Sequence, residues 1–290
     1  MKLIHSFIDK SHDITTTFLY SNISPLPGTE IGIPINIFEN IFTNLHYGSD
    51  IHIPYFIIIS LLIGHVTYGT DRYFDALEHF NSKDTIEIPK RKLDLYNYIF
   101  NNKKILKTTI IASNIALFSF FQTSPETAPF ILLLLLSNFY RQIKTKYGLL
   151  KAPFIGVMWT VASIILPCVI HDHNYDILKD FSCYLPAFFS LYASSNTADI
   201  SDVKEDKQNN IETFPVKFGV ENAIYINLIF LFISSLLFSI NPNFMHRPLI
   251  NSLFELNNVG VSFANLKAFN NTYLEDTINF NLSGNYTINI

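Results

Sequence analysis

Two groups of aspartates at helical spacing are the residues of this chain best suited to chemistry. Asp71 and Asp75 are four residues apart in the stretch TYGTDRYFDALEH. Asp199, Asp202 and Asp206 follow one another at intervals of three and four in NTADISDVKED. On a helix, these spacings place the carboxylates of each group on one face. Because like charges at these spacings repel, we expect each group to attract a cation.

Carboxylate oxygens favour a hard cation such as Mg²⁺, which keeps several waters and usually shares its ligand shell with substrate phosphates. For either group alone, a solvated helix end is the alternative, with Lys204 and Lys207 balancing the second group. Two such groups, each at the end of an apolar stretch, favour the metal hypothesis. The predicted Mg²⁺ ligands are Asp71, Asp75, Asp199, Asp202 and Asp206.

A basic stretch between the two groups predicts an anion site. Residues 139–154 read FYRQIKTKYGLLKAPF and carry four basic side chains and two tyrosines. Lysines act as point charges on phosphate oxygens, and arginine can bind phosphate in a bidentate manner. The alternative is that these residues only mark the cytoplasmic side of a membrane. Lys151 argues most strongly for a binding role, because it directly precedes Ala152 and Pro153 at the mouth of an apolar stretch.

Six apolar stretches predict the helices that carry these residues. Crossing a bilayer core of about 30 Å takes about 20 apolar residues in a helix. The shortest stretch, 127–140, taken alone also suits a helix of a soluble core, but six in one chain favour a polytopic membrane protein. They are residues 51–70, 105–121, 127–140, 152–170, 181–198 and 223–240. We therefore predict an all-α transmembrane bundle of about seven to nine helices.

The two ends of the chain are less regular. Residues 1–50 are expected to form an N-terminal segment with a helix that either crosses the membrane or is broken by Pro25, Pro27 and Gly28. Residues 249–266 are a further candidate span, weakened by Glu255. Residues 267–290 form a polar, Asn-rich tail that we place outside the bundle, and we expect no cleaved targeting segment.

Composition narrows the class of protein. Of 290 residues, only 15% are charged, against about 25% in soluble domains, and the net charge is −4. This balance excludes a generally basic nucleic-acid-binding protein and a highly charged disordered chain. Cys168 and Cys183 are the only cysteines, so there is no disulfide framework. We expect both to be small apolar side chains.

The basic residues predict the topology. Fifteen of the 20 lysines and arginines fall in three loops, at 72–107, 141–151 and 204–217. Since consecutive spans alternate in direction, the three loops lie on one side of the membrane, and the positive-inside rule makes that side cytoplasmic or its organelle equivalent. Both acidic groups begin loops of this side.

Residues 51–240 resemble the UbiA family of membrane prenyltransferases. The segment DISDVKEDKQNNIETFPVKFG, from Asp199 to Gly219, is similar to the family's second motif, D-x-x-D-x-x-x-D with a T-x-P-V-x-x-G ending. The first motif, N-x-x-x-D-x-x-x-D, has Thr67 in place of the asparagine, followed by Asp71 and Asp75. Further similarities are the Asp71-Arg72 dipeptide, the Pro89-Lys90-Arg91 run, Tyr140, Lys144, Lys151 and Trp159.

The resemblance implies that residues 51–266 are a prenyltransferase domain, which transfers an isoprenoid chain from an allylic diphosphate to an acceptor through an allylic carbocation. It implies Mg²⁺ bound by the two motifs, and a central chamber open to the cytoplasmic-side loops. The implied partners are an isoprenyl diphosphate donor, an acceptor that the sequence does not identify, and the lipid bilayer, but no nucleic acid. The implied catalytic residues are Asp71, Asp75, Asp199, Asp202 and Lys151, and the implied diphosphate-binding residues are Thr67, Arg72, Tyr140, Lys144 and Lys151.

Two alternatives remain at this stage. A membrane terpene cyclase on the same scaffold would close the cation on its own chain. A non-catalytic membrane protein that binds isoprenoid diphosphates is favoured by Thr67 and by the irregular ends. Other titratable residues are interpreted conservatively: His65 as a neutral side chain bonded to a neighbouring helix, and Glu78, His79, Asp84, His171, Asp172, His173 and Asp176 as loop residues without a metal role.

Overall fold

The computed structural model describes residues 53–81, 90–171, 181–241, 258–263 and 265–266. Every regular element in these residues is a helix, so the predicted all-α class is confirmed for the described part of the chain. The predicted N-terminal segment 1–50, the Asn-rich tail 267–290 and most of the candidate span 249–266 lie outside the described residues, and the proposed domain limits stay predictions.

The chain divides into two compact units, which we describe separately. The first takes in the described residues of Met1–Arg141 and Val161–Tyr175, and the second those of Gln142–Thr160 and Asp176–Ile290.

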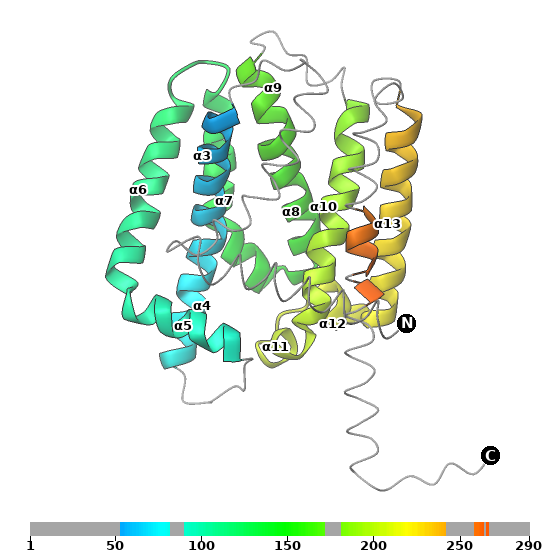
Figure 1. The fold of residues 1–290 in the computed structure, drawn as a ribbon. Coiled ribbons are helices and arrows are strands. Elements are labelled where there is room, and N and C mark those ends of the chain that lie inside the picture. The colour runs from blue at the N-terminus through cyan, green and yellow to red at the C-terminus, as the bar shows by residue number, and fades with distance from the viewer. Residues whose placement is uncertain (1–52, 82–89, 172–180, 242–257, 264, 267–290) are drawn as a thin grey trace, which may run out of the picture. The chain divides into compact units, whose positions relative to one another are not determined.

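In the first unit, three helical elements follow one another without a break. They are α3 (Ile53–Gly64), the π-helical turn η1 (His65–Gly69) and α4 (Thr70–Asn81), and they form the blue-to-cyan rod in Figure 1. A π turn contains an extra residue and changes the angular phase of the helix that follows it. The face of α4 is therefore set by η1 as well as by its own sequence.

α4 is held by two helices that follow it. α5 (Lys90–Asn101) lies at an angle to α6 (Lys103–Phe121) in Figure 1. A buried cluster joins the three helices and consists of Ala76, Tyr96, Ile99 and Leu106. His65 is fully buried, and its Nε2 lies 3.1 Å from Oγ1 of Thr109 on α6. The predicted bond of this histidine to a neighbouring helix is thus confirmed.

The unit also contains the 3-10 turn η2 (Ala128–Phe130) and the part of α7 (Ile131–Lys146) that ends at Arg141. Pro129 stands at the start of η2, where its missing N–H costs no hydrogen bond. The π turn η4 (Val161–Ile165) and α9 (Leu166–His171) complete it. Cys168, on α9, is buried as expected, whereas the side chain of Cys183 is outside the described residues.

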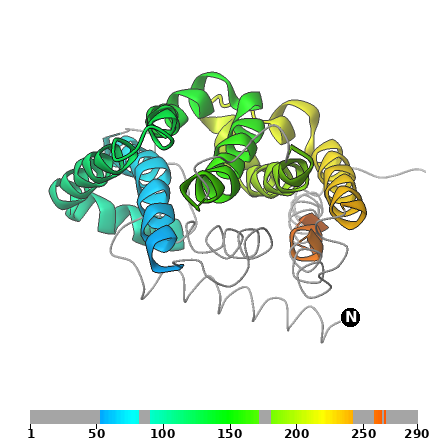
Figure 2. The same ribbon diagram turned by 90° about the horizontal axis from the view of Figure 1, so that it is seen from above.

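In the second unit, α10 (Phe181–Ser201) packs against both α8 (Lys151–Thr160) and α13 (Val220–Ile240). Gly156 permits the close approach of α8, because a Cβ there would lie 3.0 Å from the ring of Phe188 on α10. The 3-10 turn η3 (Gly148–Leu150) precedes α8. α11 (Val203–Gln208) and α12 (Phe214–Phe218) link α10 to α13, and the helical residues 258–263 lie beside α13 (Figure 2).

Three helices of the described residues are long and apolar enough to cross a membrane: Lys103–Phe121, Gly148–Ile170 and Val220–Ile240. They correspond to three of the six predicted spans. The described residues of the other three predicted spans are helical, but α7 has only 16 residues and α10 carries many polar side chains. Their crossing of a membrane remains a prediction.

One side of α13 carries a row of exposed apolar side chains. Phe232 is 69% exposed, and the row continues at helical spacing through Tyr225, Ile229, Leu236 and Ile240. Exposed apolar surface of this kind marks contact with another apolar phase or partner. Together with the length of α13, it supports a lipid-facing side.

Buried amides and hydroxyls link α10 to α13 and to the helical residues after 257, and we call this set the polar seam. Asn196 Nδ2 donates to Asn227 Oδ1 (2.7 Å), and Asn227 Nδ2 donates to Asn265 Oδ1 (2.8 Å). Ser190 donates to Asn258, whose Nδ2 donates to Ser235, and Ser234 donates to the carbonyl of Pro186. Such bonds between apolar helices each contribute about 0.6–2 kcal/mol. The seam accounts for part of the polar composition of α10.

Replacing Asn227 with Ala should lower the thermal stability of the chain, because Asn196, Thr197 and Asn265 would each lose a buried hydrogen-bond partner. We expect a loss of about 1–3 kcal/mol, measured as a lower thermal unfolding midpoint in detergent. The control is Asn222→Ala on the same helix, where the exposed amide donates to the backbone carbonyl of Phe218 at the end of α12 and takes no part in the polar seam. Equal effects of the two substitutions would contradict a role of the seam.

Replacing Gly148 with Ala should also destabilise the second unit. An added Cβ would lie 2.6 Å from the carbonyl carbon of Glu212 and 2.9 Å from the nitrogen of Thr213, and both are backbone atoms that cannot move aside. The control is Gly260→Ala, at a helical position with nothing within 4 Å, where Ala is the better helix former. Thermal unfolding should separate the two variants, and an unchanged midpoint for Gly148→Ala would refute the close approach.

Candidate functional site

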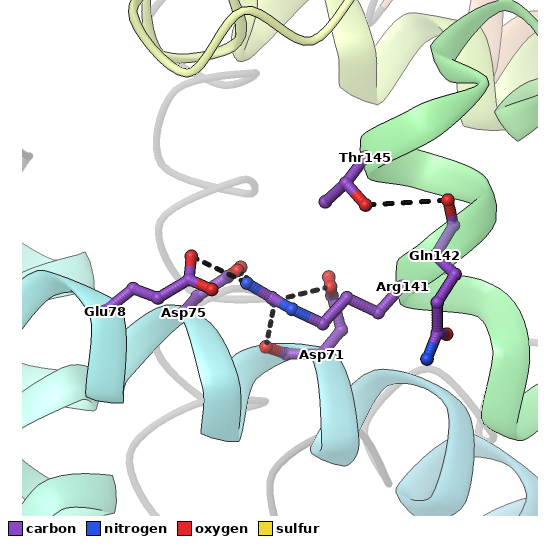
Figure 3. Close-up of polar contacts among 6 residues, drawn as sticks. All are labelled: Asp71, Asp75, Glu78, Arg141, Gln142 and Thr145. Carbon is purple, nitrogen blue, oxygen red and sulfur yellow. Dashed lines mark hydrogen bonds and ion pairs between the residues drawn. The ribbon is translucent and has the colours of Figure 1, made fainter.

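One guanidinium contacts three carboxylates on α4. We call Asp71, Asp75 and Glu78 the first acidic cluster. Arg141 Nη1 lies 2.5 Å from Asp75 Oδ1 and 3.2 Å from Asp71 Oδ1, and Nη2 lies 2.7 Å from Glu78 Oε2 (Figure 3). The same Nη1 donates to the backbone carbonyl of Asp71 at 3.1 Å. Asp71 and Asp75 therefore share one face of α4, as their spacing predicts.

The cluster is only partly open to solvent. The side chain of Asp71 is 9% exposed and that of Arg141 is 14% exposed, whereas Glu78 is 72% exposed. Burial lowers the pKa of Arg141, but the attraction and hydrogen bond of Asp75, together with Glu78 and Asp71, outweigh it and raise this pKa above its ordinary value. The guanidinium also lies 5.5 Å from the ring centre of Phe74. It is thus a permanent positive charge among the three carboxylates.

Three further predicted site residues belong to the first unit. Thr67, within η1, donates its hydroxyl to the carbonyl of Ile63 at 2.8 Å. Tyr140 is buried, with its ring edge-on to Tyr68 at 5.4 Å between ring centres. Arg72 is half-buried next to Asp71. The hydroxyl of Thr67 therefore stabilises the helix backbone in this structure.

A buried ion pair marks the second group of aspartates. Asp199, near the end of α10, is 1% exposed, and its Oδ1 accepts a hydrogen bond from Lys151 Nζ. Lys151 is the first residue of α8, and its own side chain is 9% exposed. Lys144 is close enough to act electrostatically on Asp199. The predicted binding role of Lys151 stays a prediction, because the structure shows the lysine paired with Asp199.

The helix divides at Asp202, which is a correction to the expected single helical face. Asp202 (φ −97°, ψ 4°) stands between α10 and α11. Its backbone N–H donates to the backbone carbonyl of Asp199 at 3.2 Å, and its carbonyl accepts from the backbone N–H of Asp206 at 2.8 Å. The hydrogen bond between residues 199 and 202 spans three residues instead of the four of an α-helix, and this tightens the turn. The three aspartates therefore follow a bend in the chain. We call Asp199, Asp202 and Asp206 the second acidic cluster.

Asp206 is buried and electrostatically coupled to the rest of its cluster. Burial raises the pKa of its carboxyl to about 6, Lys151 opposes this rise, and Asp199 and Asp202 add to it. A hydrogen bond from Thr213 Oγ1 to Asp206 Oδ2, at 3.0 Å, favours the ionised form. The cluster holds negative charge that its own protein partners neutralise incompletely.

The T-x-P-V-x-x-G ending folds back onto the second acidic cluster. Ile211 donates its N–H to the carbonyl of Asp206 (2.8 Å), and Thr213 is fully buried before α12. Gly219 has φ +89° at the junction of α12 and α13, a conformation that L side chains rarely adopt. Thr213 and Gly219 thus have clear structural roles: one fixes Asp206, and the other allows the chain to turn into α13.

Within the described residues, no group of three or more His, Cys, Asp or Glu side chains is arranged to hold a metal ion. The chemistry of the donors still suits Mg²⁺, because both clusters offer carboxylate oxygens. In this structure Arg141 and Lys151 contact those oxygens. Magnesium binding remains a prediction.

The structure brings Asp71 and Asp75 together through Arg141, and joins Asp199 to Lys151. The basic stretch 139–154 does not by itself predict that Arg141 contacts the first acidic cluster. The T-x-P-V-x-x-G motif likewise does not identify Asp206 as the partner of Thr213. Glu78 was interpreted as a solvated loop residue, and it is indeed exposed but contacts Arg141. Pro89, Asp84, Asp172, His173 and Asp176 lie outside the described residues.

Comparison with models of protein families, with curated proteins and with solved structures finds no match for this chain. The resemblance to the UbiA family therefore rests on the motifs quoted above.

Replacing Thr213 with Val should destabilise the chain, because the buried Asp206 carboxylate would lose its hydroxyl donor without a change in side-chain shape. The expected loss is about 1–3 kcal/mol, measured by thermal unfolding. Thr213→Ser keeps the hydroxyl and is the matched control. The bond has no stabilising role if Val and Ser unfold at the same temperature.

Proposed function

We propose that this chain is a membrane enzyme that transfers an isoprenoid chain from an allylic diphosphate to an acceptor, with Mg²⁺ as cofactor. The observation that carries the proposal is the buried pair of Lys151 and Asp199 near the end of α10, followed by Asp202 and Asp206. A buried lysine offers positive charge to a diphosphate, and the carboxylates beside it offer negative charge to the metal ion that the diphosphate carries.

The charges of the second acidic cluster suit the proposed bond cleavage. Breaking an allylic C–O bond leaves a diphosphate with additional negative charge, so preorganised cations lower the barrier. Bound Mg²⁺ would supply further charge stabilisation to the leaving group. In this proposal Lys151 moves its hydrogen bond from Asp199 to a diphosphate oxygen, while Lys144 adds positive charge nearby. The freed carboxylate of Asp199 then becomes available as an oxygen ligand.

The apolar helices suit the other product of cleavage. An allylic cation must be kept from water, and a site among apolar side chains does this while holding the hydrocarbon chain. Aromatic rings stabilise cations through their quadrupoles, and the chain has 27 Phe and 15 Tyr. We accordingly propose a multi-pass bundle of about seven to nine helices in a lipid bilayer, as the six apolar stretches predict.

The first acidic cluster has a parallel role in the proposal. Asp71 and Asp75 would bind Mg²⁺, and Arg72, Tyr140 and Thr67 would bind the diphosphate. The hydrogen bond of Thr67 to Ile63 favours a second candidate, a membrane protein that binds isoprenoid diphosphates without cleaving them, because that hydroxyl is already used by the backbone.

Replacing Asp202 or Asp71 with Ala should each reduce Mg²⁺-dependent consumption of farnesyl or geranylgeranyl diphosphate by about 100-fold or more, because a cation ligand is lost. Turnover is measured in membranes that contain the full chain, with and without EDTA. The control is Glu212→Gln, which changes an exposed carboxylate that pairs with Lys217 and should leave turnover unchanged. Full turnover in either Ala variant would refute the metal assignment.

The products of incubation with an allylic diphosphate distinguish a transferase, a terpene cyclase and a non-catalytic binding protein. A cyclic hydrocarbon formed without any acceptor would identify a terpene cyclase. Diphosphate binding under Mg²⁺ without bond cleavage would identify the non-catalytic binding protein. A donor and acceptor screen that yields a prenylated acceptor would support the transferase.

A further inference from the structure

We propose that Arg141 is the resident counter-cation of the first acidic cluster, and that a divalent cation binds there only by displacing its guanidinium. The inference rests on the proposed function in one respect, namely that the cluster is a Mg²⁺ site. It assigns to Arg141 a positioning role that the sequence motifs do not contain.

The geometry of the contacts carries the inference. Asp71, Asp75 and Glu78 occupy positions i, i+4 and i+7 of α4, and an oxygen of each contacts one guanidinium (Figure 3). Arg141 Nη1 alone lies 2.5 Å from one Asp75 oxygen and 3.2 Å from one Asp71 oxygen. A Mg²⁺ ion shared by those two oxygens would have to stand between them, at about 2.0–2.1 Å from each, and this nitrogen already contacts both. The two cations exclude each other.

The charges explain why one of the two cations is always needed. Asp71 and Asp75 are shielded from solvent, and partly buried carboxylates left without a cation are costly. Arg141 meets this requirement before any ligand binds. The four side chains together still carry a formal charge of two negative units, so the cluster continues to attract a cation.

Displacement leaves Arg141 in need of an anion, and a diphosphate supplies one. Guanidinium groups bind phosphate oxygens in a bidentate manner, as they bind carboxylates. Mg²⁺ alone should therefore bind the cluster weakly, whereas Mg²⁺ and a diphosphate should each strengthen the binding of the other. Arg141 couples the binding of Mg²⁺ to that of the diphosphate, because its guanidinium leaves the carboxylates and contacts the diphosphate instead.

The test measures Mg²⁺ binding directly, without turnover. The full chain in detergent is titrated with Mg²⁺, first alone and then with inorganic pyrophosphate, and thermal unfolding is followed. Arg141→Gln should unfold earlier than the wild type in EDTA and respond to Mg²⁺ alone with an affinity about tenfold higher or more. Adding Asp75→Asn should remove that gain. Pyrophosphate should increase the Mg²⁺ affinity of the wild type about tenfold and that of Arg141→Gln much less.

Two further variants keep the test decisive. Lys104→Gln removes a positive charge from an exposed position of α6 and should leave the Mg²⁺ response unchanged. If Arg141→Gln does not fold, Arg141→Lys replaces the fork with a point charge that cannot contact all three carboxylates, and its Mg²⁺ affinity should exceed that of the wild type. Equal Mg²⁺ affinities of the wild type and the Arg141 variants would overturn the inference, as would a gain of Mg²⁺ affinity in Lys104→Gln.

The inference and the proposed function fail separately. A wild-type chain that consumes an allylic diphosphate, with no gain of Mg²⁺ affinity on replacement of Arg141, would overturn this inference alone. A gain of Mg²⁺ affinity in a chain that consumes no allylic diphosphate would support the inference and refute the proposed function.

Discussion

The central constraint on this structure is that carboxylates next to apolar helices need a cation from another helix. Asp199, which is almost fully buried, meets Lys151 from the start of α8, and the carboxylates of α4 meet Arg141 from α7. Buried ionised groups are stable only when they are paired and hydrogen-bonded. The pairing therefore dictates how closely, and at which residue, each pair of helices meets.

The remaining packing serves to keep those pairs in position. In the first unit, the cluster around Ile99 fixes α4 against α5 and α6. In the second unit, the polar seam fixes α10 against α13, one turn away from Asp199, and Gly148 brings the start of α8 close to the loop that carries Thr213. Directional hydrogen bonds and small residues set the positions of apolar helices better than apolar contacts alone, because lipid competes equally for apolar surface.

The sequence predicted what depends on local pattern, and missed what depends on distant residues. Helical periodicity and apolar length predicted the all-α class, three helices long and apolar enough to cross a membrane, and the shared face of Asp71 and Asp75. The contact of Arg141 with Asp75 joins residues that are 66 positions apart, so no local spacing reveals it. The bend at Asp202 escaped prediction because it results from a single tightened backbone turn, and periodicity alone favours an unbroken helix. Thr213 belongs to the T-x-P-V-x-x-G motif, but the motif does not reveal its partner Asp206, because that contact depends on how the loop folds back.

Because the π turn η1 joins α3 to α4 without a break, the number of residues in this turn sets the direction in which the side chains of α4 point. Each residue of an α-helix advances the chain by about 100°, so removing one residue between Gly64 and Thr70 would rotate all of α4 by that angle relative to α3. The three carboxylates would then face away from α7, although every one of them would still be present in the sequence. Natural relatives that preserve this charge arrangement are therefore expected to vary in residue type across 65–69 far more readily than in residue number.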